Sequence, residues 1–239
     1  MDADGFFNIG PLCLWHPAVI ERAKVLVIET APQMPCVIGP EVRVHRSHVD
    51  LVIAGEDGPM PELPNAEATE VDRAVARLIA GEIEDGTCLQ VGIGGMPNAV
   101  ATLLLHSGVR DLGIHTEMLN DGLVELYRAG RVGGARKATD RGLVTDSFAL
   151  RSQATCETLH DNADFICRTV DSTNLPHVIA ANDRVVAINS TTQVDLQGQA
   201  ASESDGHRHI SGTGGQLQFV RGAYASKGGQ VLHLPGVDL

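Results

Sequence analysis

Short apolar runs alternate with segments of helical periodicity along most of the chain. Runs typical of strands occupy residues 6–9, 24–29, 49–54, 88–91, 112–116, 142–145, 163–168, 184–189 and 230–234. Helices are predicted at residues 17–23, 66–83, 96–105, 121–129, 152–160 and 176–181. This alternation of strand and helix predicts an α/β protein with an open, mostly parallel sheet.

The helix predicted at 66–83 is amphipathic, with charges on one side and apolar residues on the other. Its apolar positions at helical spacing are Val71, Ala74, Val75, Leu78, Ile79 and Ile83. Such a stripe is typical of a helix that packs one face on a core.

The stretch 112–130 combines a strand with a helix and places one carboxylate between them. The apolar run 112–116 is followed by Glu117, and Asn120 or Asp121 can cap the next helix. Gly130 has the position of a C-terminal cap glycine. Because ligands of open α/β sheets bind outside the carboxyl ends of the strands, Glu117 is a candidate functional residue.

Two glycine loops follow the same pattern of spacing. Gly92, Ile93, Gly94, Gly95 and Met96 connect a strand to a helix, and residues 212–215 form a second loop that ends in Gly214 and Gly215. Pro97 occupies the third glycine position of a dinucleotide fingerprint, so that fingerprint is not supported. Either loop is explained by a tight turn alone, or by backbone N–H donors that bind a phosphate or an oxyanion.

Residue type and spacing leave the chemistry of the individual candidates open. Glu117 fits an exposed carboxylate at a strand end as well as a nucleophile or base. His115 fits either the same sheet edge or the core. His207 and His209 share a face if extended, but no further ligands of suitable spacing accompany them, so no metal site is predicted. The basic segment 131–141 is expected to be an exposed loop.

Composition narrows the class of protein. The chain has 239 residues, of which 43% are hydrophobic and only 3% aromatic, so the core must consist of Val, Leu, Ile and Ala. The formal net charge of −12, without a long Lys/Arg run, argues against nucleic acid and anionic membranes as partners. Five cysteines without CxxC spacing indicate reduced thiols in a cytoplasmic protein. No apolar run is long enough to cross a membrane.

The pattern also suggests a division of the chain. We expect a remnant of an N-terminal α/β domain at 1–58, a Pro-rich linker at 59–64 and a main domain at 65–239. Two or three strands and one helix make a thin layer, so the first portion is expected to need further structure.

Four motifs in this order resemble the acetyl-CoA hydrolase/transferase family, close to its 4-hydroxybutyrate and butyrate:acetate CoA-transferases. They are VGIGGMPNAV at 91–100, LGIHTEMLNDGLVEL at 112–126, INSTTQVDLQGQ at 188–199 and ISGTGGQLQFVRGAYASKGG at 210–229. With the linker and the opening MDADGFFNIG, the resemblance covers nearly the whole chain. It implies the fold of class I CoA-transferases, with an incomplete N-terminal portion and an incomplete C-terminus.

The resemblance also implies a reaction. In that family a glutamate, here Glu117, attacks an acyl-CoA thioester and passes through a glutamyl-CoA thioester before a short carboxylic acid accepts the CoA. The loop from Gly92 to Met96 is implied to hold CoA and to stabilise the thioester oxyanion. Thr192, Gly214 and Gly215 match other CoA contacts of the family. The implied ligands are acyl-CoA and a short carboxylate, without a metal.

Some features depart from the family pattern or leave it open. Gln193 occupies a position where several relatives have Glu. Family members extend beyond both ends of this chain, which suggests a fragment, a truncated gene product or one subunit of a split enzyme. As partners we expect a second copy in a homodimer, or a partner subunit that supplies the missing segments. The alternatives are therefore an acyl-CoA hydrolase, in which water replaces the second carboxylate, and a non-catalytic CoA-binding subunit. The acyl group and the acceptor are not specified by any residue that we can name.

Overall fold

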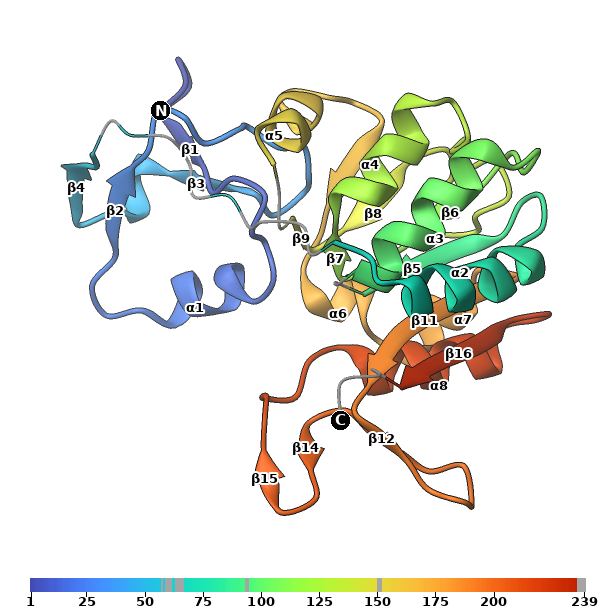
Figure 1. Ribbon diagram of the computed structural model, residues 1–239. Coiled ribbons are helices and arrows are strands. Elements are labelled where there is room, and N and C mark those ends of the chain that lie inside the picture. Colours follow the sequence, from blue (N-terminus) through green and yellow to red (C-terminus); the bar gives the residue numbers. More distant parts are fainter. Residues whose placement is uncertain (57, 59–61, 63–66, 93–94, 150–151, 236–239) are drawn as a thin grey trace.

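The computed structural model describes residues 1–56, 58, 62, 67–92, 95–149 and 152–235 (Figure 1). Its helices are α1 (His16–Arg22), α2 (Glu70–Glu82), α3 (Gly95–His106), α4 (Asp121–Arg128), α5 (Gln153–Leu159), α6 (Val170–Thr173), α7 (Pro176–Ala180) and α8 (Gln216–Ala225). Its strands are β1 (Phe6–Asn8), β2 (Val27–Thr30), β3 (Arg43–His45), β4 (Leu51–Ala54), β5 (Cys88–Val91), β6 (Gly113–Ile114), β7 (Met118–Leu119), β8 (Val144–Asp146), β9 (Phe148–Ala149), β10 (Phe165–Cys167), β11 (Val185–Thr191), β12 (Gln193–Val194), β13 (Ala200–Ala201), β14 (Ser204–Asp205), β15 (Arg208–His209) and β16 (Gln230–Pro235).

The centre of the molecule is a parallel sheet with the strand order β16-β11-β5-β6. A parallel bridge between His115 and Thr145 continues it to β8, which pairs in parallel with β10. The sheet is therefore open and parallel, as the alternation of strands and helices predicted. Its carboxyl ends meet along one edge, where the loops that precede α3 and α4 begin.

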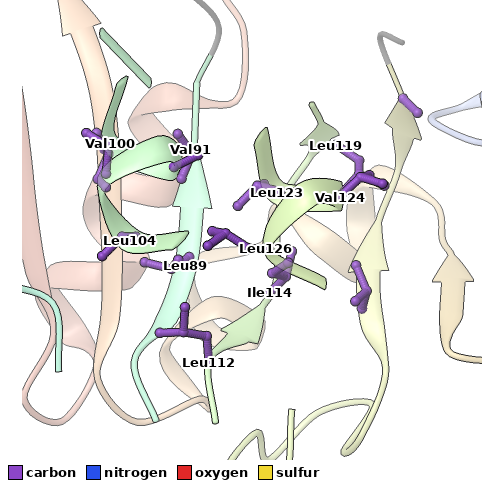
Figure 2. Packing of buried hydrophobic residues seen from close by; sticks show 14 of the residues in the cluster. Leu89, Val91, Val100, Leu104, Leu112, Ile114, Leu119, Leu123, Val124 and Leu126 are labelled. Atoms are coloured by element: carbon purple, nitrogen blue, oxygen red, sulfur yellow. The ribbon is translucent and has the colours of Figure 1, made fainter. Parts of the chain in front are cut away.

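Helices cover both faces of this sheet. On β5, Leu89 and Val91 belong to the larger apolar cluster, whereas Cys88 belongs to a second cluster with Ile179 of α7 and Phe219 of α8. Figure 2 shows Leu89 and Val91 beside the α3 and α4 side chains of the larger cluster. Because successive strand residues alternate between the two clusters, both faces of the strand are buried, as expected for a parallel sheet.

The N-terminal portion forms a separate thin layer, at the left of Figure 1. Its β1 pairs with β3 in antiparallel orientation, and β2 pairs with β4 in parallel. By its apolar composition the run at 24–29 predicts a buried strand, but this prediction is wrong in its burial, because β2 is only partly covered and every residue of β4 is exposed. Four apolar side chains of these two strands are exposed to solvent: Val27, Leu51, Val52 and Ile53.

The helix predicted at 66–83 exists, but its buried face is rotated from the expected one. A capping box starts α2, because Thr69 Oγ1 accepts from the Asp72 backbone N–H and the Asp72 carboxylate accepts from that of Thr69. Ala76 and Ile79 are buried, whereas Val71 and Leu78 are exposed. The small Ala76 permits close approach to α3. Because the buried face of a helix with 3.6 residues per turn is narrow, Leu78 cannot be buried together with Ala76 and Ile79.

The segment 131–141 is not wholly exposed, because Lys137 lies in the interior. Most of the linker predicted at 59–64 lies outside the described residues, so the domain division stays a prediction. No helix in the described ranges is both long and apolar enough to span a bilayer.

Candidate active site

Glu117 lies at the carboxyl end of the sheet, between β6 and β7. Its backbone carbonyl accepts hydrogen bonds from the N–H groups of Ser147 (2.9 Å) and Phe148 (3.0 Å). These bonds tie the loop to the next strand pair, β8 and β9. The two-residue strand β7 between Glu117 and α4 was not predicted, and it fixes the direction in which the Glu117 side chain leaves the sheet.

The carboxylate of Glu117 lies against Gly215, the residue that precedes α8. A Cβ atom at Gly215 would be 1.8 Å from Glu117 Oε2 and 2.7 Å from Nδ2 of Asn174. Only glycine leaves room for the carboxylate at this point. Helix α8 has no side-chain cap, and the negative group lies beside its N-cap residue, at the end of the helix where the dipole is positive.

Asn120 connects the Glu117 loop to the first glycine loop. Its Oδ1 accepts from the backbone N–H of Leu123 (3.0 Å) and so caps α4. Its Nδ2 donates to the carbonyl of Gly92 (2.9 Å). The N–H of Gly92 is itself bonded to the carbonyl of Ile188 (2.9 Å), so Gly92 cannot offer that donor to a ligand.

A cleft of about 290 Å³ brings several of the predicted residues together. Glu117, Gly92, Gly214 and Gly215 all line it. Its other lining residues are Gln90, Val91, Met118, Phe148, Asn189, Ser202, Glu203, Ser211, Gly212, Gln216 and Phe219. The cleft thus lies between the carboxyl ends of β5 and β11 and the start of α8.

The remaining predicted residues do not line this cleft or fall outside the description. Met96 is buried in the core, and Gly95 faces the backbone of Glu67 and Ala68 at the start of α3. The hydroxyl oxygen of Thr192 lies 2.6 Å from the carbonyl oxygens of both Ala201 and Ser204, so its one proton can be donated to either of them. Thr192 thereby contacts the segment that carries β13 and β14 and does not face the cleft. Ile93 and Gly94 lie outside the described residues.

Sequence reasoning missed three amide side chains at the site: Asn174, Gln90 and Asn189. The hydroxyl of Thr173 donates to Asn174 Oδ1 (2.8 Å), so this bond orients the amide with its NH₂ group toward Glu117 and Gly215. Asn174 ends the short helix α6, and a lone Asn near a Pro indicates only a turn or a cap. No sequence signal distinguished its role.

His115 is part of the core and not of the cleft. Its Nε2 lies 2.8 Å from the carbonyl of Thr173, which requires that Nε2 carry the proton and donate. Burial, helped by the nearby Lys137, lowers the pKa of this imidazole to about 4. The ring is therefore neutral at physiological pH and orients the segment that carries Asn174.

A buried polar network lies beneath the Glu117 loop. Lys137 Nζ donates to the carbonyls of Ile114 (2.8 Å) and Leu143 (2.7 Å) and to Thr145 Oγ1 (2.6 Å), and burial lowers its pKa to about 8. Thr145 in turn donates to Asp140, which is paired with Arg168. Burial by itself would raise the pKa of Asp140, but the hydrogen bond from Arg168 holds that pKa below its usual value.

Asp146 is a second buried group at this depth. Burial raises the pKa of its carboxyl group to about 7, and its Oδ2 has no hydrogen-bond partner among the residues that the structure describes. His207 and His209 are exposed, far from such interior groups. Within the described ranges, no cluster of three or more His, Cys, Asp or Glu side chains could hold a metal ion.

The fold and the cleft together define an open α/β domain with a candidate ligand site at the carboxyl edge of its sheet. An open parallel sheet places one carboxylate beside a glycine that precedes a helix, and opposite a second glycine loop. This is the organisation that the resemblance to class I CoA-transferases led us to expect.

Comparison with known proteins agrees with that class. Residues 152–237 match the model of the acetyl-CoA hydrolase/transferase C-terminal domain. The chain is 44% identical to the butyryl-CoA:acetate CoA-transferase of Anaerostipes caccae, over 96% of this chain and 52% of that protein. It is 37% identical to the 4-hydroxybutyrate coenzyme A transferase of Clostridium kluyveri, over 97% and 53%.

A solved structure gives the same result. The crystal structure of RipA from Yersinia pestis superposes with a TM-score of 0.89 at 41% identity, and the match covers 98% of this chain and 51% of that one. The chain spans about half the length of the curated relatives that it matches. It belongs to the acetyl-CoA hydrolase/transferase family.

Proposed function

We propose that this chain transfers coenzyme A between an acyl-CoA and a short-chain carboxylic acid, with Glu117 as the nucleophile. The observation that carries the proposal is the position of the Glu117 carboxylate against Gly215, in a cleft that the start of α8 and Gly92 also line. An anion in this position is aligned with the positive end of a helix, and the cleft gives a thioester access to it.

The proposed reaction has four covalent steps. A carboxylate oxygen of Glu117 attacks the thioester carbonyl, and CoA leaves as its thiolate with the formation of an acyl-glutamyl anhydride. The thiolate attacks the glutamyl carbonyl, which releases the first carboxylate and forms a glutamyl-CoA thioester. The second carboxylate attacks that thioester, and the released thiolate then attacks the new anhydride to give product and free Glu117. Each step preserves the energy of an activated acyl group, so no ATP is required.

The side chains and backbone near Glu117 support the charge changes of these steps. Each attack puts negative charge on a carbonyl oxygen, which preorganised donors stabilise by roughly 3 kcal/mol per donor. Asn174 Nδ2 and Gly215, the N-cap residue of α8, lie beside the carboxylate. For the first loop, the Gly92 N–H is already bonded, so we propose that any donor from that loop is a backbone N–H that follows Gly92 in the chain.

We infer that a partner subunit supplies further α/β structure over β2 and β4. Both strands carry exposed apolar side chains, among them Val27 and Val52, each 47% exposed. A parallel sheet is normally covered on both faces. The relatives that the chain matches contain about as much chain again.

The five cysteines are all free thiols, which supports a reducing compartment such as the cytoplasm.

The test is mass spectrometry with peptide mapping after incubation with acetyl-CoA or butyryl-CoA. A CoA-sized adduct is expected on Glu117 and should be absent from Glu117→Gln, which keeps the shape of the side chain. Glu203→Gln is the matched control, because Glu203 is the other carboxylate that lines the cleft. That variant should still form the adduct.

Other outcomes identify the alternatives. Release of free CoA and acid without a carboxylate acceptor would indicate an acyl-CoA hydrolase. A folded chain that binds CoA and never forms an adduct would contradict the transferase proposal for this chain alone, and would favour a CoA-binding subunit of a split enzyme.

A further inference from the structure

Gln90 and Asn189 form a reciprocal pair at the base of the cleft. Gln90 Nε2 donates to Asn189 Oδ1 (3.1 Å), and Asn189 Nδ2 donates to Gln90 Oε1 (3.0 Å). The two residues lie on the neighbouring strands β5 and β11 and are 6% and 7% exposed. Two adjacent buried amides at this depth need an explanation, because apolar side chains would fill the space at less cost.

The pair faces the site and not the core. Both side chains line the same cleft as Glu117. The position of a Cβ on Gly92 would be 3.6 Å from Asn189 Oδ1, so the amide lies directly beneath the glycine loop. A ligand that reaches Glu117 through this cleft therefore passes the pair.

The pair also has unused hydrogen-bonding capacity. A primary amide has two N–H donors and two acceptor lone pairs, and the reciprocal bonds use one donor and one lone pair of each residue. Within the described part of the chain, neither side chain has another hydrogen-bond partner. One donor and one acceptor of each amide thus remain for a ligand.

We propose that Gln90 and Asn189 bind the secondary amide of the pantetheine arm that is nearest the thioester, an inference that rests on the proposed function. That amide is separated from the sulfur by two methylene groups, so it follows directly behind the reacting carbonyl. It presents one N–H and one C=O, which match the unused acceptor and donor of the pair. A neutral pair also suits a neutral arm in a cleft that already contains the carboxylates of Glu117 and Glu203.

The first test changes the ligand and leaves the protein intact. Isothermal titration calorimetry with the full chain would compare pantetheine with an analogue in which an ester replaces the cysteamine amide. We expect at least tenfold weaker binding of the ester, because it lacks the N–H donor. Equal affinities would overturn the inference while CoA binding still supports the proposed function. Failure to bind CoA at all would overturn both.

The second test separates recognition from a purely structural role. The double variant Gln90→Met/Asn189→Leu removes both partners together, so no buried amide is left unpaired and the fold is expected to keep its melting temperature. Pantetheine affinity should fall at least tenfold, and the preference for amide over ester should disappear. Tyr127→Phe, which removes a hydrogen bond to Asp164 away from the cleft, is the control. A double variant that binds pantetheine as the wild type does would show that the pair only joins β5 to β11.

Discussion

At the scale of single residues, a missing Cβ determines where the Glu117 carboxylate can lie. Gly215 and Gly214 are neighbours in the chain and line the same cleft. A Cβ on Gly215 would overlap Glu117 Oε2, whereas a Cβ on Gly214 would have no heavy atom within 4 Å. Gly215 is therefore needed to leave space for Glu117 inside the protein. A side chain at Gly214 would meet no protein atom and could interfere only with a ligand.

This difference predicts opposite results for two alanine variants. Gly215→Ala should displace the carboxylate and lower the rate of adduct formation on Glu117 by about 100-fold, since small misplacements of a reacting group have effects of this size. Gly214→Ala should keep the fold and the adduct. Single-turnover mass spectrometry would measure both rates, and equal rates would contradict the assigned position of Glu117.

A buried carboxyl group should make stability depend on pH. The pKa of Asp146 is about 7 in the folded protein and about 3.8 when the chain is unfolded, because burial favours the protonated form. Between these values the folded state binds more protons than the unfolded state, so the free energy of unfolding falls as pH rises, by about 1.4 kcal/mol per pH unit. Above pH 7 this contribution is constant.

The variant Asp146→Asn removes that titration. It should unfold at higher urea concentration than the wild type at pH 8, and the difference should shrink toward pH 4. Urea titrations at both pH values would measure it. Asp183→Asn, at an exposed position, is the control and should leave the pH dependence of the wild type unchanged. A pH-independent difference for Asp146→Asn would contradict the assigned burial.

At the scale of elements, Asn120 joins the helix α4 to the first glycine loop. Replacing it with Asp keeps the acceptor that caps α4 but removes the donor to the Gly92 carbonyl. We expect Asn120→Asp to lose only the hydrogen bond to Gly92. Asn120→Ala should lose that bond and also the cap of α4, which stabilises the helix by about 1 kcal/mol. Hydrogen exchange should show faster opening at the start of α3 in both variants. Unchanged exchange there would show that the loop does not depend on Asn120.

The same elements show what the sequence could predict. Most strand and helix positions followed from apolar periodicity, and Glu117 was correctly expected at the carboxyl end of a strand, but helix α8 was not predicted. The buried face of α2 was not predictable, because Leu78 and Ile79 are adjacent apolar residues and only contact with α3 decides between them. The burial of Lys137 was also missed, since its three acceptors come from segments that meet only in the fold.

The amide side chains of the site were missed for a related reason. Asn174, Gln90 and Asn189 have no characteristic spacing, because separate elements bring them together. The family motifs located Glu117, Gly214 and Gly215 through local sequence, which is a different kind of information. The roles of these residues in catalysis stay predictions.

At the scale of the whole molecule, the chain contains a well-covered sheet and a poorly covered one. The β2–β4 pair exposes Val25, Val27, Leu51, Val52 and Ile53. Exposed apolar side chains that gather on one pair of strands are typical of an interaction site. The proposed partner subunit would cover it, and a second copy of this chain is the alternative that solution measurements must distinguish.

The double variant Val27→Lys/Val52→Lys tests the role of this surface. Because neither side chain is buried, the melting temperature should change little, whereas binding of an apolar fluorescent dye should fall at least twofold. Leu78→Lys, an exposed position on α2, is the matched control. Light scattering would identify a homodimer that the double variant dissociates. Such a dimer would contradict the proposal of a different partner.

The strand order of the central sheet also has a consequence for how the chain folds. β5 pairs with β6 across a single helix, so this unit can form early, while its other neighbour β11 arrives much later: 99 residues separate Gln90 from Asn189. Pairing over such a distance makes folding slow, and apolar strand edges stay open until it is complete. During synthesis, Glu117 is thus in position on the early unit long before Gly215 emerges, and the cleft is among the last parts of the molecule to be assembled.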